Sequence, residues 1–127
     1  MPRWDPGLIL VRIPAKPLAS SLMIHEEIRN LLETPPTGED APSLDHIEHT
    51  LTAGYARALA LEAERWRLER KIAQVVAKLG AEASQQKASE LAQLGRRLST
   101  ADVDLTQLRA LLSSLRIRAD ETRATAG

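Results

Sequence analysis

Apolar residues recur at alternating intervals of three and four residues along two long stretches of the chain. The first stretch keeps one heptad register over eleven positions, Leu44, Ile47, Leu51, Gly54, Ala58, Leu61, Arg65, Leu68, Ile72, Val75 and Leu79. A repeat of 3.5 residues places these side chains on one side of a slightly underwound helix. Eight of the eleven residues are large and aliphatic, so this side of the helix must pack against another apolar surface.

The second stretch offers such a surface within the same chain. Its heptad positions are Leu91, Leu94, Leu98, Ala101, Leu105, Leu108, Leu112, Leu115, Ala119 and Thr122. Between the two stretches, Gly80 can end the first helix in the left-handed conformation, and Ser84 can cap the second. Because two helices joined by a short loop lie antiparallel, the pattern predicts a hairpin with helices at about 44–79 and 85–123.

Folding the chain at this loop places small residues of one helix opposite large residues of the other. The expected pairs are Gly54 with Leu108, Ala58 with Leu105, and Leu61 with Ala101. Such complementarity is what close interior packing requires. Residues 99–102 are similar to a helix start of the capping-box type, but the heptad phase runs through them. We therefore expect one continuous second helix, with a break near Ser99 as the alternative.

Residues 1–16 are interpreted as an extended N-terminal arm. Residues 8–13 are rich in β-forming side chains and are bounded by prolines. Such an arm can pack on the helices, pair with a copy of itself, or add a strand to the sheet of a partner.

The pattern predicts a short helix at residues 17–33. A Pro-rich linker at residues 34–43 connects this helix to the hairpin. Ile24, Ile28 and Leu31 share one face of this helix, and Pro35 and Pro36 prevent its continuation. Residues 44–127 then form the hairpin. The predicted fold class is all-α: a long antiparallel coiled-coil hairpin with an N-terminal arm and short helix, which pairs into a helical bundle.

A second apolar stripe on the first long helix lies off the seam of the hairpin. It consists of Tyr55, Leu59, Ala63, Trp66, Ala73 and Val76. Two helices alone would leave the stripe exposed, and such stripes mark contacts. Either the short N-terminal helix covers it, or two hairpins pair through it as a homodimer. We favour the dimer, with Tyr55, Leu59, Trp66 and Val76 in the interface.

Arg65 is the one charged residue in the seam of the first helix. A charge in a seam costs stability but can fix the register of the two helices. In the predicted hairpin, Asp102 lies about one turn from the position that faces Arg65. We therefore predict an ion pair between Arg65 and Asp102 that sets the register.

Composition and charge exclude several classes of protein. The chain of 127 residues has no Cys, and its 17 basic and 17 acidic residues cancel. It therefore lacks thiol chemistry and the one-signed charge expected of a protein that binds DNA or an anionic membrane. Its apolar run at residues 7–11 is too short for a signal-peptide core or a membrane span. We expect a cytoplasmic protein.

Residues 45–49, Asp-His-Ile-Glu-His, form the densest cluster of potential metal ligands. His46 and His49 share a helix face, and His25 could approach from the short helix. The spacing matches neither the zinc-protease pattern nor the paired Glu-x-x-His of di-iron bundles. We favour a solvated first turn and expect no metal or other cofactor. A metal-binding helical protein using His46 and His49 is the alternative.

The charged stretch at residues 62–71 surrounds Trp66 with bases and acids at helical spacing. This interleaving is typical of a coiled-coil flank rather than a nucleic-acid site. In outline the hairpin is similar to those of RNA polymerase secondary-channel factors, which carry acidic residues at the tip to hold a catalytic metal. Here the tip offers only Glu82.

The sequence has no Ser-His-Asp set, Gly-rich phosphate loop or cofactor motif. We therefore expect a non-enzymatic interaction, scaffold or adaptor protein that acts through coiled-coil surfaces, without a small-molecule substrate. Its partner is itself or a larger protein assembly. A nucleic-acid or RNA polymerase accessory factor is the alternative.

Overall fold

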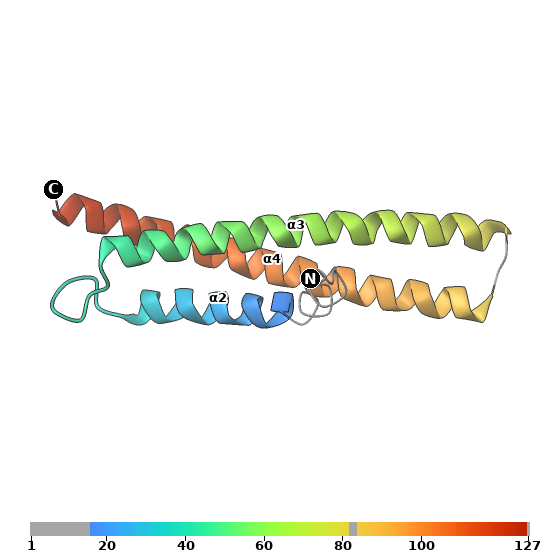
Figure 1. Ribbon diagram of the computed structural model, residues 1–127, viewed down its shortest axis with the longest axis horizontal. Helices are drawn as coiled ribbons and strands as arrows, with labels where there is room; N and C mark the ends of the chain where they lie inside the picture. Colours follow the sequence, from blue (N-terminus) through green and yellow to red (C-terminus); the bar gives the residue numbers. More distant parts are fainter. Residues whose placement is uncertain (1–15, 82–83, 127) are drawn as a thin grey trace, which may run out of the picture.

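The computed structural model describes residues 16–81 and 84–126, and this part of the chain folds into three α-helices. Helix α2 is Lys16–Glu33, helix α3 is Leu44–Ala81 and helix α4 is Gln85–Ala126 (Figure 1). No strand occurs among these described residues. The predicted all-α fold class is therefore confirmed. The arm expected at residues 1–16 lies, except for Lys16, outside the described residues.

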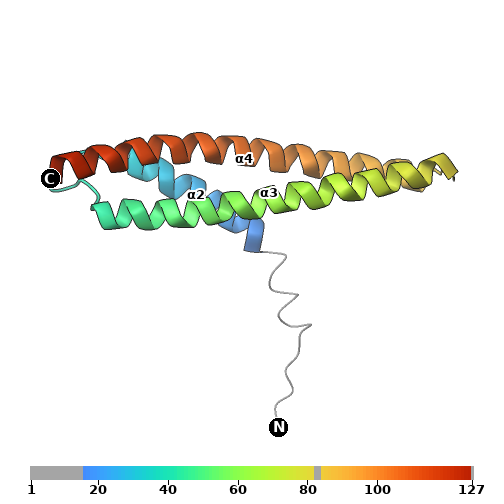
Figure 2. The same ribbon diagram turned by 90° about the horizontal axis from the view of Figure 1, so that it is seen from above.

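Helices α3 and α4 lie side by side and antiparallel, as predicted (Figures 1 and 2). Helix α4 is continuous through Ser99 and runs on beyond Arg123 to Ala126. At its start, the backbone N–H of Lys87 donates a hydrogen bond to the Oγ of Ser84 at 3.1 Å. Ser84 is thus the predicted cap, since its hydroxyl satisfies a backbone donor of the first turn.

The expected end of α3 at Gly80 is wrong, because the helix continues through Gly80 to Ala81. Among the described glycines only Gly38 has a positive φ, at 102°. Gly80 therefore does not adopt the left-handed conformation that would end the helix there.

The seam between α3 and α4 contains the side chains that the heptad pattern predicted. Every predicted seam position on both helices is buried or partly buried. The core divides into two clusters along the hairpin. The larger cluster lies where α2 joins the hairpin, and the smaller one holds Leu68, Val75 and Leu94 toward the tip.

The register differs from the expected one at Gly54. A Cβ atom at this glycine would overlap Cδ2 of Leu112 and would lie 3.4 Å from Cγ of the same side chain. Gly54 therefore faces Leu112, and the expected pairing with Leu108 is wrong by one turn. The physical reason is that α3 extends past Gly80 to Ala81 while α4 begins at Gln85 as expected, so the residue of α4 that faces a given position of α3 lies later in the chain.

Helix α2 packs along one flank of the hairpin and contacts both long helices. Its apolar face of Ile24, Ile28 and Leu31 is buried. Figure 2 shows α2 crossing both α3 and α4, and Figure 1 shows that it accompanies only the half of the hairpin away from the tip. The described part of the chain is therefore a three-helix bundle in one half and a two-helix coiled coil in the other.

Arg118 of α4 ties the C-terminal end of α2 to the hairpin. Its guanidinium donates hydrogen bonds to three backbone oxygens, those of Leu32 at 2.8 Å, Thr34 at 3.0 Å and Leu31 at 3.4 Å. The last carbonyls of a helix have no partner within the helix, and a cation is favoured there by the helix dipole. Arg118 thus supplies the C-terminal cap of α2 from a distant part of the chain.

Two glycines of the long helices allow a matched test of this packing. Gly95 lies within α4 with nothing within 4 Å of an added Cβ, whereas Gly54 meets Leu112. Either Gly→Ala change gains about 1 kcal/mol of helix propensity. We expect Gly95→Ala to raise the free energy of unfolding by this amount, and Gly54→Ala to be about 1–3 kcal/mol less stable than Gly95→Ala because of overpacking. Urea denaturation measures both, and equal gains would contradict the close approach of α3 and α4.

Candidate protein-interaction site

The outer apolar face of α3 consists of the four predicted interface residues, and all four side chains are exposed. The exposed fractions are 42% for Tyr55, 67% for Leu59, 58% for Trp66 and 50% for Val76. Exposed aromatic and large aliphatic residues at helical spacing form an apolar surface, and such surfaces mark contact sites. No other segment among residues 16–81 and 84–126 covers this face.

Helix α2 does not cover this outer face, so the alternative in which the short helix covers the stripe is wrong. Ile28 of α2 approaches Gly54, with its Cδ1 3.5 Å from the position of an added Cβ. On the same flank of α3, Thr50 is buried, and its hydroxyl donates a hydrogen bond to the carbonyl of His46 at 3.0 Å. At 3.6 residues per turn, Tyr55 and Leu59 point to the other flank.

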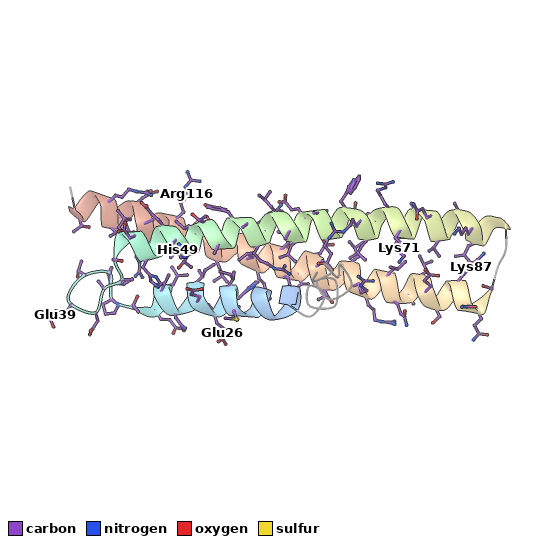
Figure 3. The ribbon with its side chains drawn as sticks, viewed as in Figure 1. Glu26, Glu39, His49, Lys71, Lys87 and Arg116 are labelled. Carbon is purple, nitrogen blue, oxygen red and sulfur yellow. The ribbon has the colours of Figure 1, made fainter. Side chains whose placement is uncertain are left out.

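A groove between α3 and α4 runs beside this face. Its volume is about 450 Å³, and it is lined by Tyr55, Ala58, Leu59 and Glu62 of α3 and by Arg109, Leu112, Ser113 and Arg116 of α4. Figure 3 shows Arg116 on the side of the bundle away from α2 and Glu26. An apolar groove of this kind can receive an anchor side chain of a partner protein.

An ion pair between Glu62 and Arg109 bridges the two helices at one end of the groove. Beyond it lies a second depression of about 310 Å³ beside Trp66, which the same two residues also line. The apolar groove and the Trp66 depression therefore form one continuous surface, crossed by one polar bridge.

The guanidinium of Arg70 lies over the ring of Trp66, 4.7 Å from its centroid. This cation–π contact orients an exposed indole and contributes about 0.5–1 kcal/mol at such a site. An oriented tryptophan loses less conformational freedom on binding, which suits an anchor residue of an interface. Val76 is exposed nearer the tip and is not among the residues that line the groove or the depression.

The structure brings together Arg65 and Asp102, the residues predicted to set the register. Nε of Arg65 lies 3.0 Å from Oδ1 of Asp102 and 3.1 Å from Oε1 of Glu69. All three side chains are nearly half exposed, so solvent screens the pair and its contribution is about 0–1 kcal/mol. The contact links the two helices at a fixed register, and its exposure limits its contribution to stability.

The candidate metal ligands are not brought together. His46 and His49 are exposed, whereas His25 is buried. Within residues 16–81 and 84–126, no group of three or more His, Asp or Glu side chains is placed to hold a metal ion. Among the helices of this part of the chain, none is long and apolar enough to cross a membrane.

Sequence reasoning missed the contacts that join distant parts of the chain. Besides Arg118, it missed the cross-helix pairs of Glu62 with Arg109 and of Glu48 with Arg123, the latter at 2.9 Å. Opposite charges flank the seam at these positions, and this signal could have been used once the register was known.

Comparison of the chain with family models, with curated proteins and with solved structures returned no match.

Replacing Arg65 tests what the seam charge contributes. Arg65→Leu removes a half-exposed ion pair worth about 0–1 kcal/mol and gains about 1 kcal/mol from apolar burial in the seam. We expect the melting temperature to rise by roughly 2–4 °C, measured by circular dichroism. Arg67→Leu, at an exposed position on the same helix, is the control and should change it little. A clear fall for Arg65→Leu would show that the ion pair stabilises the fold.

Proposed function

We propose that this protein is a non-enzymatic interaction or scaffold protein that binds other protein surfaces through the outer apolar face of α3. The observation that carries this proposal is the exposure of Tyr55, Leu59 and Trp66 beside an apolar groove. Burying such a face removes apolar surface from water at about 25 cal/mol per Å². A partner that covers it therefore gains binding energy from side chains that contribute little to the core of the chain.

The supporting scaffold suits this role. Tyr55, Leu59 and Trp66 project from the middle of a long helix whose adjacent side is fixed in the seam. A rigid helix pays little ordering entropy when a partner binds. Apolar anchors surrounded by polar groups, here Glu62, Arg109 and Arg116, are the usual composition of a protein interface.

The nucleic-acid alternative has less support from the same surface. Trp66 already lies under the guanidinium of Arg70, and the arginines of its depression, Arg65 and Arg109, are paired with the acids Glu69 and Glu62. Arginines that are already paired with carboxylates offer little net charge to a phosphate backbone, on which nucleic-acid affinity depends. The outer apolar face of α3 therefore favours a protein partner.

Affinity capture with matched variants tests the proposal. Three tagged forms of the chain are expressed in the source cells and recovered after crosslinking. They are the unchanged chain, the double variant Leu59→Ala plus Trp66→Ala, and the single variant Ile117→Ala. Ile117 is equally exposed on α4 but does not line the groove. We expect proteins captured by the unchanged chain, including further copies of the chain itself, to fall at least tenfold with the double variant and to persist with Ile117→Ala. Equal capture by all three would contradict the proposal.

A further inference from the structure

We propose that the occupant of the outer apolar face of α3 is a second copy of this chain, placed antiparallel about a two-fold axis between Glu62 and Ala63. This inference rests on the proposed function and names its partner. In such a dimer the α3 helices of the two copies lie against each other and run in opposite directions. The tip half of each copy then lies along the three-helix half of the other.

The spacing of the exposed residues is self-complementary about this point. Leu59 and Trp66 lie equally far along α3 on either side of it, so antiparallel pairing places Leu59 of each copy against Trp66 of the other. The same pairing places Tyr55 opposite Arg70, whose guanidinium already lies over an aromatic ring. The small, exposed Ala63 near the axis lets the two backbones approach closely, as a two-fold symmetric interface requires.

The charges along α3 select the antiparallel orientation. The first turns of the helix carry Asp45 and Glu48, whereas its last part carries Arg67, Arg70, Lys71 and Lys78 with the single acid Glu69. Antiparallel copies place the acidic start of one helix near the basic end of the other. A parallel pair would place like charges together, which costs association free energy.

Charges elsewhere in the molecule are distributed in the same direction as those of α3, with basic residues toward the tip and acidic residues away from it. From residue 67 to residue 97, around the tip, there are seven basic and three acidic residues. Helix α2 and the loop after it carry mainly acids on their exposed side, Glu26, Glu27, Glu33, Glu39 and Asp40. Since α2 accompanies only the half away from the tip (Figure 1), antiparallel pairing aligns the acidic half of one copy with the basic half of the other. Helix α2 lies on the flank away from this interface, so its acids act only through the longer-range field of the molecule.

Helix α3 rather than α4 offers the apolar contact. The α4 wall of the groove presents Arg109, Ser113 and Arg116 to solvent. The exposed large apolar residues of α4, Val103 and Ile117, do not line the groove. The two-fold axis therefore passes through the outer face of α3, which carries the exposed aromatic residues Tyr55 and Trp66.

Single cysteines test the geometry directly, because the chain has no Cys of its own. In the full chain, Ala63→Cys lies next to the axis and should form a disulfide-linked dimer on mild oxidation at micromolar concentration. Val76→Cys is the control: its two copies would be about 27 residues apart along the helix axis, roughly 40 Å at 1.5 Å per residue. That separation exceeds the reach of a disulfide, about 7 Å between Cα atoms. Non-reducing electrophoresis measures both.

We expect most of Ala63→Cys and little of Val76→Cys to become crosslinked. Adding Trp66→Ala to Ala63→Cys should reduce crosslinking severalfold, and adding Ile117→Ala should not. Equal crosslinking of both cysteine variants would indicate parallel or random contact and would overturn the inference, and so would crosslinking of neither. If crosslinking fails while capture of another protein still depends on Leu59 and Trp66, only the second copy is excluded. If that capture fails as well, the proposed function fails with it.

Discussion

The apolar seam between α3 and α4 is the constraint on which the rest of the structure depends. Neither long helix can remain in water with one apolar side, so the two pack along their whole length and bury that side. At Gly54 the missing side chain leaves room for Leu112, which brings the helices close together there. Beside the seam, each long helix has two further flanks. What packs on these flanks determines the position of α2 and which apolar residues stay exposed.

The two flanks of the seam differ in what packs against them. One flank receives α2, whose Ile28 completes the larger core cluster and whose C-terminal end is capped by Arg118. The other flank receives nothing from the described part of the chain and keeps Tyr55, Leu59 and Trp66 exposed. A folded protein that keeps aromatic residues in water on a rigid helix loses the benefit of burying them. A partner that closes this flank restores that benefit, and this is the physical basis of the proposed function.

The sequence predicted the seam well because heptad spacing depends only on local helix geometry. Every seam residue, the continuity of α4 and the cap at Ser84 follow from periodicity and capping chemistry. The predicted end of α3 was wrong because Gly80 tolerates a helix as well as a left-handed turn. That error also displaced the predicted partner of Gly54 by one turn. The flank chosen by α2 and the cap from Arg118 depend on contacts between distant residues, which no local pattern encodes. For the candidate site, exposure of the predicted stripe followed from the same periodicity, whereas the groove and its bridge by Glu62 and Arg109 required the register.

The molar mass in solution, measured by light scattering on a sizing column, tests the central claim most directly. That claim is that a second copy closes the outer apolar face of α3. The account predicts twice the chain mass of 14.0 kDa for the unchanged protein. It predicts a shift toward one chain mass for Trp66→Ala, and no shift for Val103→Ala, which changes an exposed residue of α4 outside the groove. A mass of one chain for the unchanged protein across the micromolar range, or a dimer that Trp66→Ala leaves intact, would contradict it.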